Sequence, residues 1–275
     1  MLKKALENIL SQEESAELFS SFDQIGEIIV LRIPDSLKSK KKIIGETLLD
    51  KVKTTRSVFY QSSPVEGEFR TRNLEILAGE DNTETEYKEN GCRFLVDVEK
   101  VFFSPRLSTE RERISRLVSD GEVMINMFGG VGMFSILAAK MKNCTVYNID
   151  INPDASLLCE KNIKRNKLKG NVISLNDDAT KIIENKLQNL ADRVLMLLPE
   201  KSDEFLDIAA LAVKNNGIIH YYSHIHADKK QDAPKLSEQH YLSIAKNRSE
   251  ILNSRIVRPV GPRFYQTVVD VKIEK

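Results

Sequence analysis

The chain has 275 residues, and 41% of them are hydrophobic, which is enough for one large core or for two cores of unequal size. Its 41 basic and 40 acidic residues nearly cancel, which excludes RNA binding by bulk positive charge and leaves only a local patch for that purpose. No apolar run approaches the roughly 18 residues of a membrane-spanning helix, so no membrane partner is expected.

The cysteines indicate a reducing compartment. Three of them lie far apart and form no CxxC pair, namely Cys92, Cys144 and Cys159. This spacing predicts free buried thiols rather than a disulfide framework or a zinc site. The first residues turn polar too soon for a signal peptide, so we expect a cytoplasmic protein.

Residues 1–95 predict a small α+β domain. Apolar residues at helical spacing from Leu2 to Leu10 indicate an amphipathic helix over residues 1–20, docked on the body or on a partner. A β-branched run over 25–34 ends in proline and predicts a strand. The lysines of 38–42 begin a helix, either as a solvated start, which we favour, or as a phosphate-contacting patch. Short strands are expected over 58–61, 74–77 and 92–96.

Residues 96–275 predict an α/β domain with a doubly wound, mostly parallel sheet. A charged helix over 108–118 comes first, with Ser108 as the expected N-cap. Strand signals then alternate with helical segments, which implies right-handed crossovers. The strands are expected over 123–127, 145–149, 172–175, 193–197 and 217–222, and the helices over 132–142, 153–166, 179–189 and 202–214. Segments 254–257 and 265–273 would complete the sheet as a hairpin-like edge.

A glycine-rich loop follows the first of these strands. Gly129, Gly130 and Gly132 stand between strand and helix, where glycine permits positive φ and lets a ligand approach the backbone. A phosphate loop is excluded because the Gly-Lys-Ser/Thr sequence is absent. A dinucleotide loop is disfavoured because Ser135 occupies the place of its third glycine or alanine. The remaining interpretations are an S-adenosylmethionine loop and a plain strand–helix turn.

Acidic residues follow the next two strands. Asp150 comes about 20 positions after the loop, where a carboxylate accepts hydrogen bonds from both hydroxyls of a ribose. Asp178 follows the third strand, where it could meet an adenine amino group, although either Asp177 or Asp178 is also expected to cap the next helix. Three such features at one edge of a sheet favour a nucleoside cofactor.

Longer blocks of the sequence resemble a known family. They are Phe-Ser-Pro-Arg-Leu-Ser-Thr-Glu-Arg over 103–111, Met-Phe-Gly-Gly-Val-Gly over 127–132 and Asn-Pro-Asp-Ala over 152–155. With Gly-Glu-Phe-Arg over 67–70, they are similar to the archaeal and eukaryotic tRNA (guanine-N1)-methyltransferases, which act on position 37 of tRNA. The resemblance implies a Rossmann-like domain, S-adenosylmethionine as cofactor, and the tRNA anticodon stem-loop as partner. The N-terminal domain would contact tRNA, and we expect a monomer.

The resemblance also implies roles for single residues. Glu110 would be the general base that takes the proton of guanine N1, and Arg70 would stabilise charge on O6. Without the resemblance to this family, Glu110 would be interpreted as a carboxylate that interacts with the helix dipole, and Arg70 as a member of an ion pair at a strand edge. The cofactor would contact Arg106, Phe128, Gly130, Gly132, Asp150, Ile151, Asp178, Ala179, Leu197 and Pro199. No metal site is expected, and the histidines at 220, 224 and 226 are expected to face solvent or RNA.

Two departures from the family leave alternatives open. The chain starts at the family's second domain, without the N-terminal domain that grips the tRNA elbow in archaeal members. Leu197 stands where the family has the asparagine of Met-Asn-Leu-Pro. An aminocarboxypropyl transferase of the wybutosine pathway, which uses the same cofactor, is compatible with both. An inactive RNA-binding homologue is a second alternative, and an NAD-dependent dehydrogenase is disfavoured by Ser135.

Overall fold

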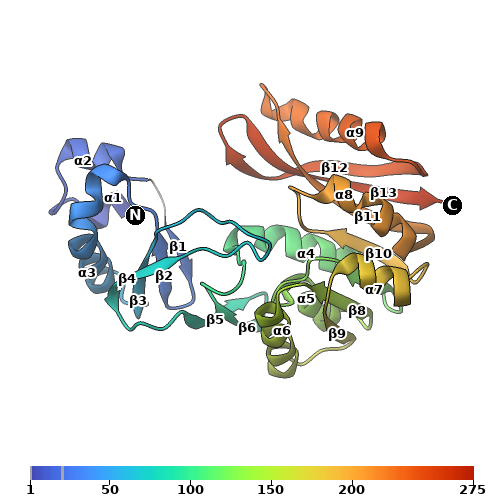
Figure 1. Ribbon diagram of the computed structural model, residues 1–275, viewed down its shortest axis with the longest axis horizontal. Coiled ribbons are helices and arrows are strands. Elements are labelled where there is room, and N and C mark those ends of the chain that lie inside the picture. The colour runs from blue at the N-terminus through green and yellow to red at the C-terminus, as the bar shows by residue number, and fades with distance from the viewer. Residues whose placement is uncertain (1, 20–21) are drawn as a thin grey trace. The chain divides into compact units, whose positions relative to one another are not determined.

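The computed structural model describes residues 2–19 and 22–275 (Figure 1). The chain forms two compact units, Met1–Pro105 and Arg106–Lys275, each with its own sheet. The sequence placed the boundary at residue 95. Residues 96–105 instead pack back on the first unit, because the ring of Phe103 meets that of Tyr87 edge-on, with centroids 4.9 Å apart.

The N-terminal unit is built on a four-stranded sheet in the order β1-β2-β3-β4. Its parallel central pair is joined through a 3-10 turn and helix α3, and its outer strands run antiparallel. Gly26, with φ of 56°, turns the chain sharply, so the predicted strand over 25–34 becomes two shorter ones. The elements are β1 (Asp23–Ile25), β2 (Ile28–Leu31), η1 (Asp35–Lys40), α3 (Lys41–Lys51), β3 (Ser57–Gln61), β4 (Leu74–Gly79) and the hairpin β5 (Glu84–Glu89) and β6 (Cys92–Asp97).

The first residues form two short helices, α1 (Leu2–Ala5) and α2 (Gln12–Glu17), rather than one. Ser11 caps α2: its hydroxyl accepts from the Glu14 N–H at 3.1 Å, and its own N–H donates to the Glu14 carboxylate at 2.8 Å. Four leucines of this segment are buried in one core cluster with Ile44 and Leu48 of α3, which confirms docking on the body; they are Leu2, Leu6, Leu10 and Leu18. Residues 1 and 20 of the predicted helix lie outside the described residues.

The lysines of 38–42 are largely paired within the unit. Lys38 lies 2.7 Å from Asp35, Lys40 lies 2.6 Å from Glu14, and Lys41 lies 2.8 Å from Glu75. These exposed ion pairs support the interpretation as a solvated helix start.

The C-terminal unit confirms the doubly wound fold. Its seven-stranded sheet has the order β12-β13-β11-β10-β7-β8-β9, in which β7 to β11 are parallel and β13 inserts antiparallel between β11 and β12 (Figure 1). The strands are β7 (Val123–Asn126), β8 (Thr145–Asp150), β9 (Asn171–Asn176), β10 (Ala191–Met196), β11 (Val213–His226), β12 (Arg248–Gly261) and β13 (Phe264–Glu274).

The helices divide between the two faces of this sheet. Apolar side chains such as Ile125, Val194 and Tyr221 form the core under α7, α8 and α9. Because side chains alternate along a strand, the opposite face carries Asn126 and Asn148, which bond to Ser135 of α5. The helices are η2 (Pro105–Leu107), α4 (Ser108–Leu117), α5 (Met133–Met141), α6 (Pro153–Arg165), α7 (Ala179–Lys186), α8 (Ser202–Ala212), η3 (Lys230–Asp232) and α9 (Ala233–Ile244).

Three local expectations differ from the structure. Ser108 is the first residue of α4 rather than its cap, because the turn η2 runs directly into the helix. Helix α9 was not predicted, and it packs on β12 and β13. Strand β11 extends to His226, well past the predicted end at 222. Among residues 2–19 and 22–275, no helix has the length and apolarity to cross a membrane.

Candidate functional site

The glycine loop connects β7 to α5 and exposes its backbone at one point. Gly130 and Gly132 have φ of 53° and 88°, in the left-handed region that favours glycine. A Cβ on Gly132 would lie 2.7 Å from the Cys159 sulfur, whereas one on Gly130 would meet no atom within 4 Å. The backbone of Gly130 therefore faces open space, as close approach of a cofactor requires.

Strand β8 holds this loop in place through Asn148 and Asp150. The Gly130 N–H donates to Asp150 Oδ2 at 2.6 Å, and Asn148 donates to the Gly130 carbonyl at 3.2 Å. The Asn152 N–H donates to Asp150 Oδ1 at 2.9 Å. Burial raises the pKa of Asp150, while the two backbone N–H groups oppose that rise. An ionised carboxylate has about four acceptor positions, so one on each oxygen remains for two ribose hydroxyls.

The loop after β9 contains two carboxylates, Asp177 and Asp178, which make different contacts. Asp178 is the N-cap of α7, and its side chain accepts from the Lys181 N–H at 3.2 Å. The expectation that one of the pair caps the helix is thus confirmed, and Asp178 is that residue. Asp177 is exposed, and its carboxylate accepts the N–H of Asp178 at 2.8 Å. Asp177, which was not singled out as a cofactor residue, is more exposed than Asp178 and is a further candidate for contact with a ligand; the spacing from Asp178 to Lys181 was the available signal.

The remaining residues of this edge are largely apolar. Phe128 packs edge-on against Phe205 of α8, with ring centroids 5.0 Å apart, so its ring belongs to the core. Leu197 and Pro199 are half-buried in the loop after β10 and place no charged group there. Ile151 is 37% exposed beside Asp150, and Ala179 is buried at the start of α7.

Glu110 of α4 is buried, with only 2% exposure, and its carboxylate accepts hydrogen bonds from three side chains. Arg113 donates to Oε1 at 2.7 Å and to Oε2 at 3.0 Å. The Tyr222 hydroxyl donates to Oε1 at 2.7 Å, and Arg255 donates to Oε2 at 3.3 Å. Burial, with the Glu110 carboxylate adding to it, raises the pKa of Tyr222 well above its usual range, so the phenol remains a donor.

The register of the sheet locates this carboxylate. Tyr221 lies opposite Met196, the last residue of β10, so Tyr222 is level with Leu197, just beyond that strand. Glu110, bonded to Tyr222, therefore lies at the carboxyl edge of the sheet, the same edge as the glycine loop. Ligands of open α/β sheets bind at this edge.

Arg70 lies in the N-terminal unit on a tight turn rather than at a strand edge. Its N–H donates to the Gly67 carbonyl at 3.2 Å, and its φ is 54°. Such a conformation costs a residue with a Cβ about 1–2 kcal/mol. Its guanidinium lies 4.1 Å from the centre of the Phe102 ring, a cation–π contact that fixes its direction. Arg106, on the turn η2 of the other unit, is exposed.

The expectation that the histidines face solvent or RNA is wrong for His220. This side chain is fully buried, and its Nδ1 lies 2.5 Å from Asp270 while its Nε2 lies 2.7 Å from Arg193. The reason is that His220 lies within a central strand of the sheet, opposite Leu195 of β10 and Asp270 of β13, on the face that carries Asp270 and Arg193. His226, near the end of the strand, is exposed. Within the described part of the chain, no group of three histidine, cysteine or acidic side chains is arranged to hold a metal ion.

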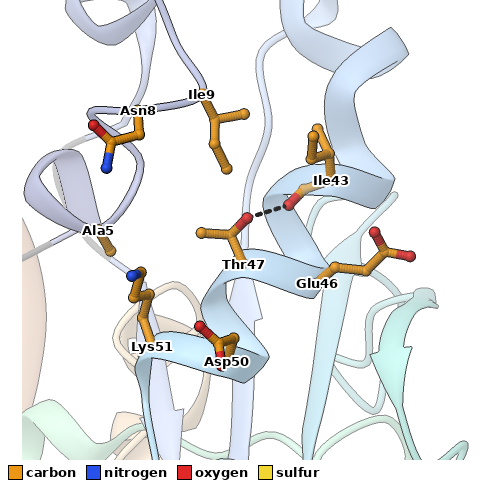
Figure 2. A pocket seen from close by; sticks show the side chains of 8 residues that line it. All are labelled: Ala5, Asn8, Ile9, Ile43, Glu46, Thr47, Asp50 and Lys51. Carbon is orange, nitrogen blue, oxygen red and sulfur yellow. Dashed lines mark hydrogen bonds between the residues drawn. The ribbon is translucent and has the colours of Figure 1, made fainter.

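The cavity in Figure 2 belongs to the N-terminal unit and has a different character. It measures about 350 Å³ and lies between α3 and the segment that follows α1. Its side chains mix two carboxylates, an ammonium group and apolar groups, without a glycine turn or a ribose-binding acid at a strand end. They are Ala5, Asn8, Ile9, Ile43, Glu46, Thr47, Asp50 and Lys51. This cavity lacks the features of the candidate cofactor site at the glycine loop.

Comparison with known proteins gives matches along most of the chain. The TRM5/TYW2 methyltransferase domain matches residues 85–248, and the TYW2 N-terminal domain matches residues 2–83. The tRNA (guanine(37)-N(1))-methyltransferase Trm5b of Pyrococcus abyssi is 40% identical over 265 residues, which are 95% of this chain and 77% of that protein.

Other relatives carry different names. The tRNA 4-demethylwyosine(37)-methyltransferase Taw21 of Saccharolobus solfataricus is 34% identical, over 94% of this chain and 96% of that protein. The tRNA(Phe) (4-demethylwyosine(37)-C(7)) aminocarboxypropyltransferase of Methanocaldococcus jannaschii is 33% identical, over 92% of this chain and 98% of that protein.

Solved structures agree with these matches. The structure of aTrm5 with tRNALeu superposes with a TM-score of 0.84 at 39% identity, covering 99% of this chain and 78% of that one. The structure of M. jannaschii TYW2 with AdoMet has a TM-score of 0.68 at 28% identity, covering 93% of this chain and all of that one. The methyltransferase-domain match spans more than half of the sequence, so this chain belongs to the TRM5/TYW2 family of methyltransferases.

Proposed function

We propose that this chain transfers a methyl group from S-adenosylmethionine to N1 of guanosine 37 in tRNA. The observation that carries the proposal is a buried carboxylate, Glu110, at the same sheet edge as the open backbone of Gly130 and the ribose-type acid Asp150. The similarity to Trm5b, at 40% identity over 95% of the chain, supports this substrate. We further propose that the chain acts as a cytoplasmic monomer on the anticodon stem-loop.

The cofactor residues fit a nucleoside with a charged sulfonium. Asp150 would accept the ribose hydroxyls, and the Gly130 backbone would lie against the ligand. Because Asp178 caps α7, we propose that Asp177 shares or takes over the contact with the adenine amino group. When bound, S-adenosylmethionine supplies the activated methyl group. The predicted neighbours of the ligand are otherwise retained: Arg106, Phe128, Gly132, Ile151, Ala179, Leu197 and Pro199.

Glu110 and Arg70 would carry the proton chemistry. Guanine N1 holds a proton and is a poor nucleophile until that proton leaves. Glu110 would accept it, and a positioned base of this kind contributes typically about 10²–10⁴-fold. Arg70 would place its guanidinium against the negative charge that develops on O6. The Phe102 contact restricts the directions in which that guanidinium can point.

A tRNA transcript with guanosine at position 37 tests this function. We expect nucleoside mass spectrometry to show 1-methylguanosine after incubation with the protein and S-adenosylmethionine. Glu110→Gln keeps the shape but cannot accept a proton, so the single-turnover rate constant should fall by about 10²–10⁴-fold. Glu112→Gln is the matched control, since Glu112 is a more exposed acid of the same helix, paired with Arg116. A wild-type rate in Glu110→Gln would refute the assignment of the base.

A second candidate reaction is favoured by Leu197. An aliphatic side chain offers no hydrogen bond to guanine, and it is compatible with a different base at the site. Taw21 and the aminocarboxypropyltransferase, whose names specify 4-demethylwyosine, are matched over nearly their whole lengths. The same mass measurement on tRNA carrying 4-demethylwyosine would separate methyl from aminocarboxypropyl transfer. Calorimetry with S-adenosylmethionine tests whether the chain is an inactive RNA-binding homologue, because that alternative predicts that the cofactor does not bind.

A further inference from the structure

A chain of buried polar side chains runs from Glu110 across the sheet. Arg113, which binds Glu110, also donates to Asp270 of β13 at 2.6 and 3.2 Å. Asp270 lies opposite His220 in the β11–β13 register, and the two side chains are 2.5 Å apart. The far side of the imidazole contacts Arg193 of β10 at 2.7 Å. Nothing in the proposed reaction so far uses this chain beyond Glu110.

The direction of each hydrogen bond in this chain is fixed by chemistry. A guanidinium can only donate, so Nε2 of His220 must accept from Arg193. The proton of the neutral ring is therefore on Nδ1, and it donates to Asp270. Burial lowers the pKa of His220; Asp270 opposes this effect, and Arg193 adds to it. Burial disfavours the ionised Asp270 carboxylate, but bonds from His220 and Arg113 outweigh it and hold the pKa of Asp270 far below its usual value.

This arrangement cannot conduct a proton to or from Glu110. Arg113 stands between Asp270 and Glu110, and an arginine does not release its proton in a protein. Burial disfavours its charge, yet the bonds to both carboxylates raise the pKa of Arg113 further. The chain therefore acts by holding geometry. Arg193 is itself anchored by Glu122 at 3.0 Å and by the Leu117 carbonyl at 2.9 Å, so the far end is fixed to the end of α4.

Arg113 distinguishes the two oxygens of Glu110. It uses Nε and Nη2 for Glu110 and Nη1 and Nη2 for Asp270, so the plane of its guanidinium is set by both carboxylates. Oε1 of Glu110 receives two short bonds, at 2.7 Å each, from Arg113 and Tyr222. Oε2 receives one bond at 3.0 Å and a longer one at 3.3 Å from Arg255, whose side chain is 34% exposed.

We propose that Asp270, oriented by His220, is a positioning residue that fixes Arg113 and thereby leaves Oε2 of Glu110 as the atom that accepts the substrate proton. The inference rests on the proposed function. In the step concerned, the N1–H bond of the purine breaks, the proton bonds to Oε2, and the electron pair of that bond stays on N1. Oε1, held by two bonds of 2.7 Å, keeps the carboxylate from rotating during this transfer, while the longer bond to Oε2 from the partly exposed Arg255 gives way to the substrate.

Two substitutions at His220 test the role of the imidazole. In His220→Gln, the neutral side chain can still accept from Arg193 and donate to Asp270, whereas His220→Leu can do neither. We expect His220→Leu to lower the single-turnover rate constant at least about tenfold, because small misplacements of catalytic groups are costly. Affinities for S-adenosylhomocysteine and tRNA should stay within about twofold, and His220→Gln should recover most of the rate. Equal losses in both variants, or none in His220→Leu, would overturn the proposal.

Further variants separate this inference from the function on which it rests. Asp270→Asn should slow the reaction like His220→Leu; if it does not fold, the His220 pair still decides. Asp192→Asn is the control, since it breaks a carboxylate–Lys214 pair at the amino end of the same sheet and should leave the rate unchanged. If Glu110→Gln reacts at the wild-type rate, the proposed function fails. If Glu110→Gln is slow but His220→Leu is not, only the inference fails.

The tautomer of His220 provides a readout that needs no activity. ¹⁵N NMR of the full chain distinguishes a neutral ring protonated on Nδ1 from one protonated on Nε2 or on both nitrogens. We expect the Nδ1–H form near neutral pH, and its loss in the Asp270→Asn variant. An imidazolium or an Nε2–H ring in the wild-type protein would refute the chain of contacts from Arg193 to Glu110.

Discussion

Gly129 and Gly130 are neighbours in sequence, but each lacks a side chain for a different reason. A Cβ on Gly129 would lie 2.1 Å from the Asn148 side chain, so this glycine is required by packing between β7 and β8. Gly130 has positive φ and faces open space, so this glycine is required by the turn and, in our proposal, by the ligand. The sequence motif alone does not distinguish these two roles.

Alanine at each position should therefore give opposite results. Gly129→Ala should lower the free energy of unfolding by several kcal/mol, as overpacking of a closed site does, typically about 1–3 kcal/mol or more. Gly130→Ala should cost about 1 kcal/mol of strain while weakening S-adenosylmethionine binding markedly. Urea unfolding and calorimetry measure the two quantities. A Gly130→Ala protein that binds the cofactor normally would contradict the assigned approach to the backbone.

At the scale of elements, one row of the large sheet explains the polar face under α4 and α5. Asn148, Asn126, His220 and Asp270 lie in register across β8, β7, β11 and β13, with Leu195 of β10 between them. Residues of one row point to the same face, so these polar side chains lie along one line across the sheet, interrupted by Leu195. At one end the line holds the glycine loop through Asn148, and toward β13 it holds Arg113.

The contribution of the α2 capping box to the stability of the fold can be measured separately. Ser11→Ala removes the acceptor for the Glu14 N–H, and the loss of such a cap typically costs about 1 kcal/mol. Leu10 and Leu18, which flank α2, are buried in the core of the N-terminal unit, so this cost should be visible in the stability of that unit. Chemical unfolding monitors it, with Ser15→Ala, inside the helix, as the matched control. An unchanged midpoint in Ser11→Ala would show that packing alone holds the segment.

At the scale of the whole molecule, two ionisable side chains, His220 and Asp270, link the stability of the fold to pH. His220 has a lowered pKa, so the unfolded chain binds a proton below about pH 6.5 that the folded chain does not. Asp270 has a depressed pKa, so its stabilising effect is present above about pH 4 and is lost as pH falls below that value. Both effects make the folded state less stable as the solution becomes acidic, in separate ranges.

The free energy of unfolding should therefore fall between pH 7 and pH 5, before most carboxylates titrate. His220→Gln cannot take up the proton in either state, so it should show a flatter dependence in this range. Urea titrations at a series of pH values provide the comparison. A wild-type protein as stable at pH 5 as at pH 7, or a variant with an undiminished slope, would contradict a buried neutral imidazole.

The sequence by itself determined the features that depend on local chemistry. The alternation of strands and helices predicted the parallel sheet, and the glycine loop with Asp150 indicated the edge of it at which we propose the cofactor binds. These signals are readable because periodicity and turn residues act over a few positions. The same locality explains the errors: the helix over 1–20 was predicted without its break between Ala5 and Gln12, and α9 lacked a recognised start.

Only the tertiary structure decided which side chains meet across the fold. His220 is bonded to Asp270, fifty residues away, and Glu110 to Arg255, 145 residues away. The boundary at Pro105 likewise follows from the contact of Phe103 with Tyr87 rather than from composition. Such pairings depend on strand order and register, which are set by burial of the whole core, and no spacing along the chain encodes them.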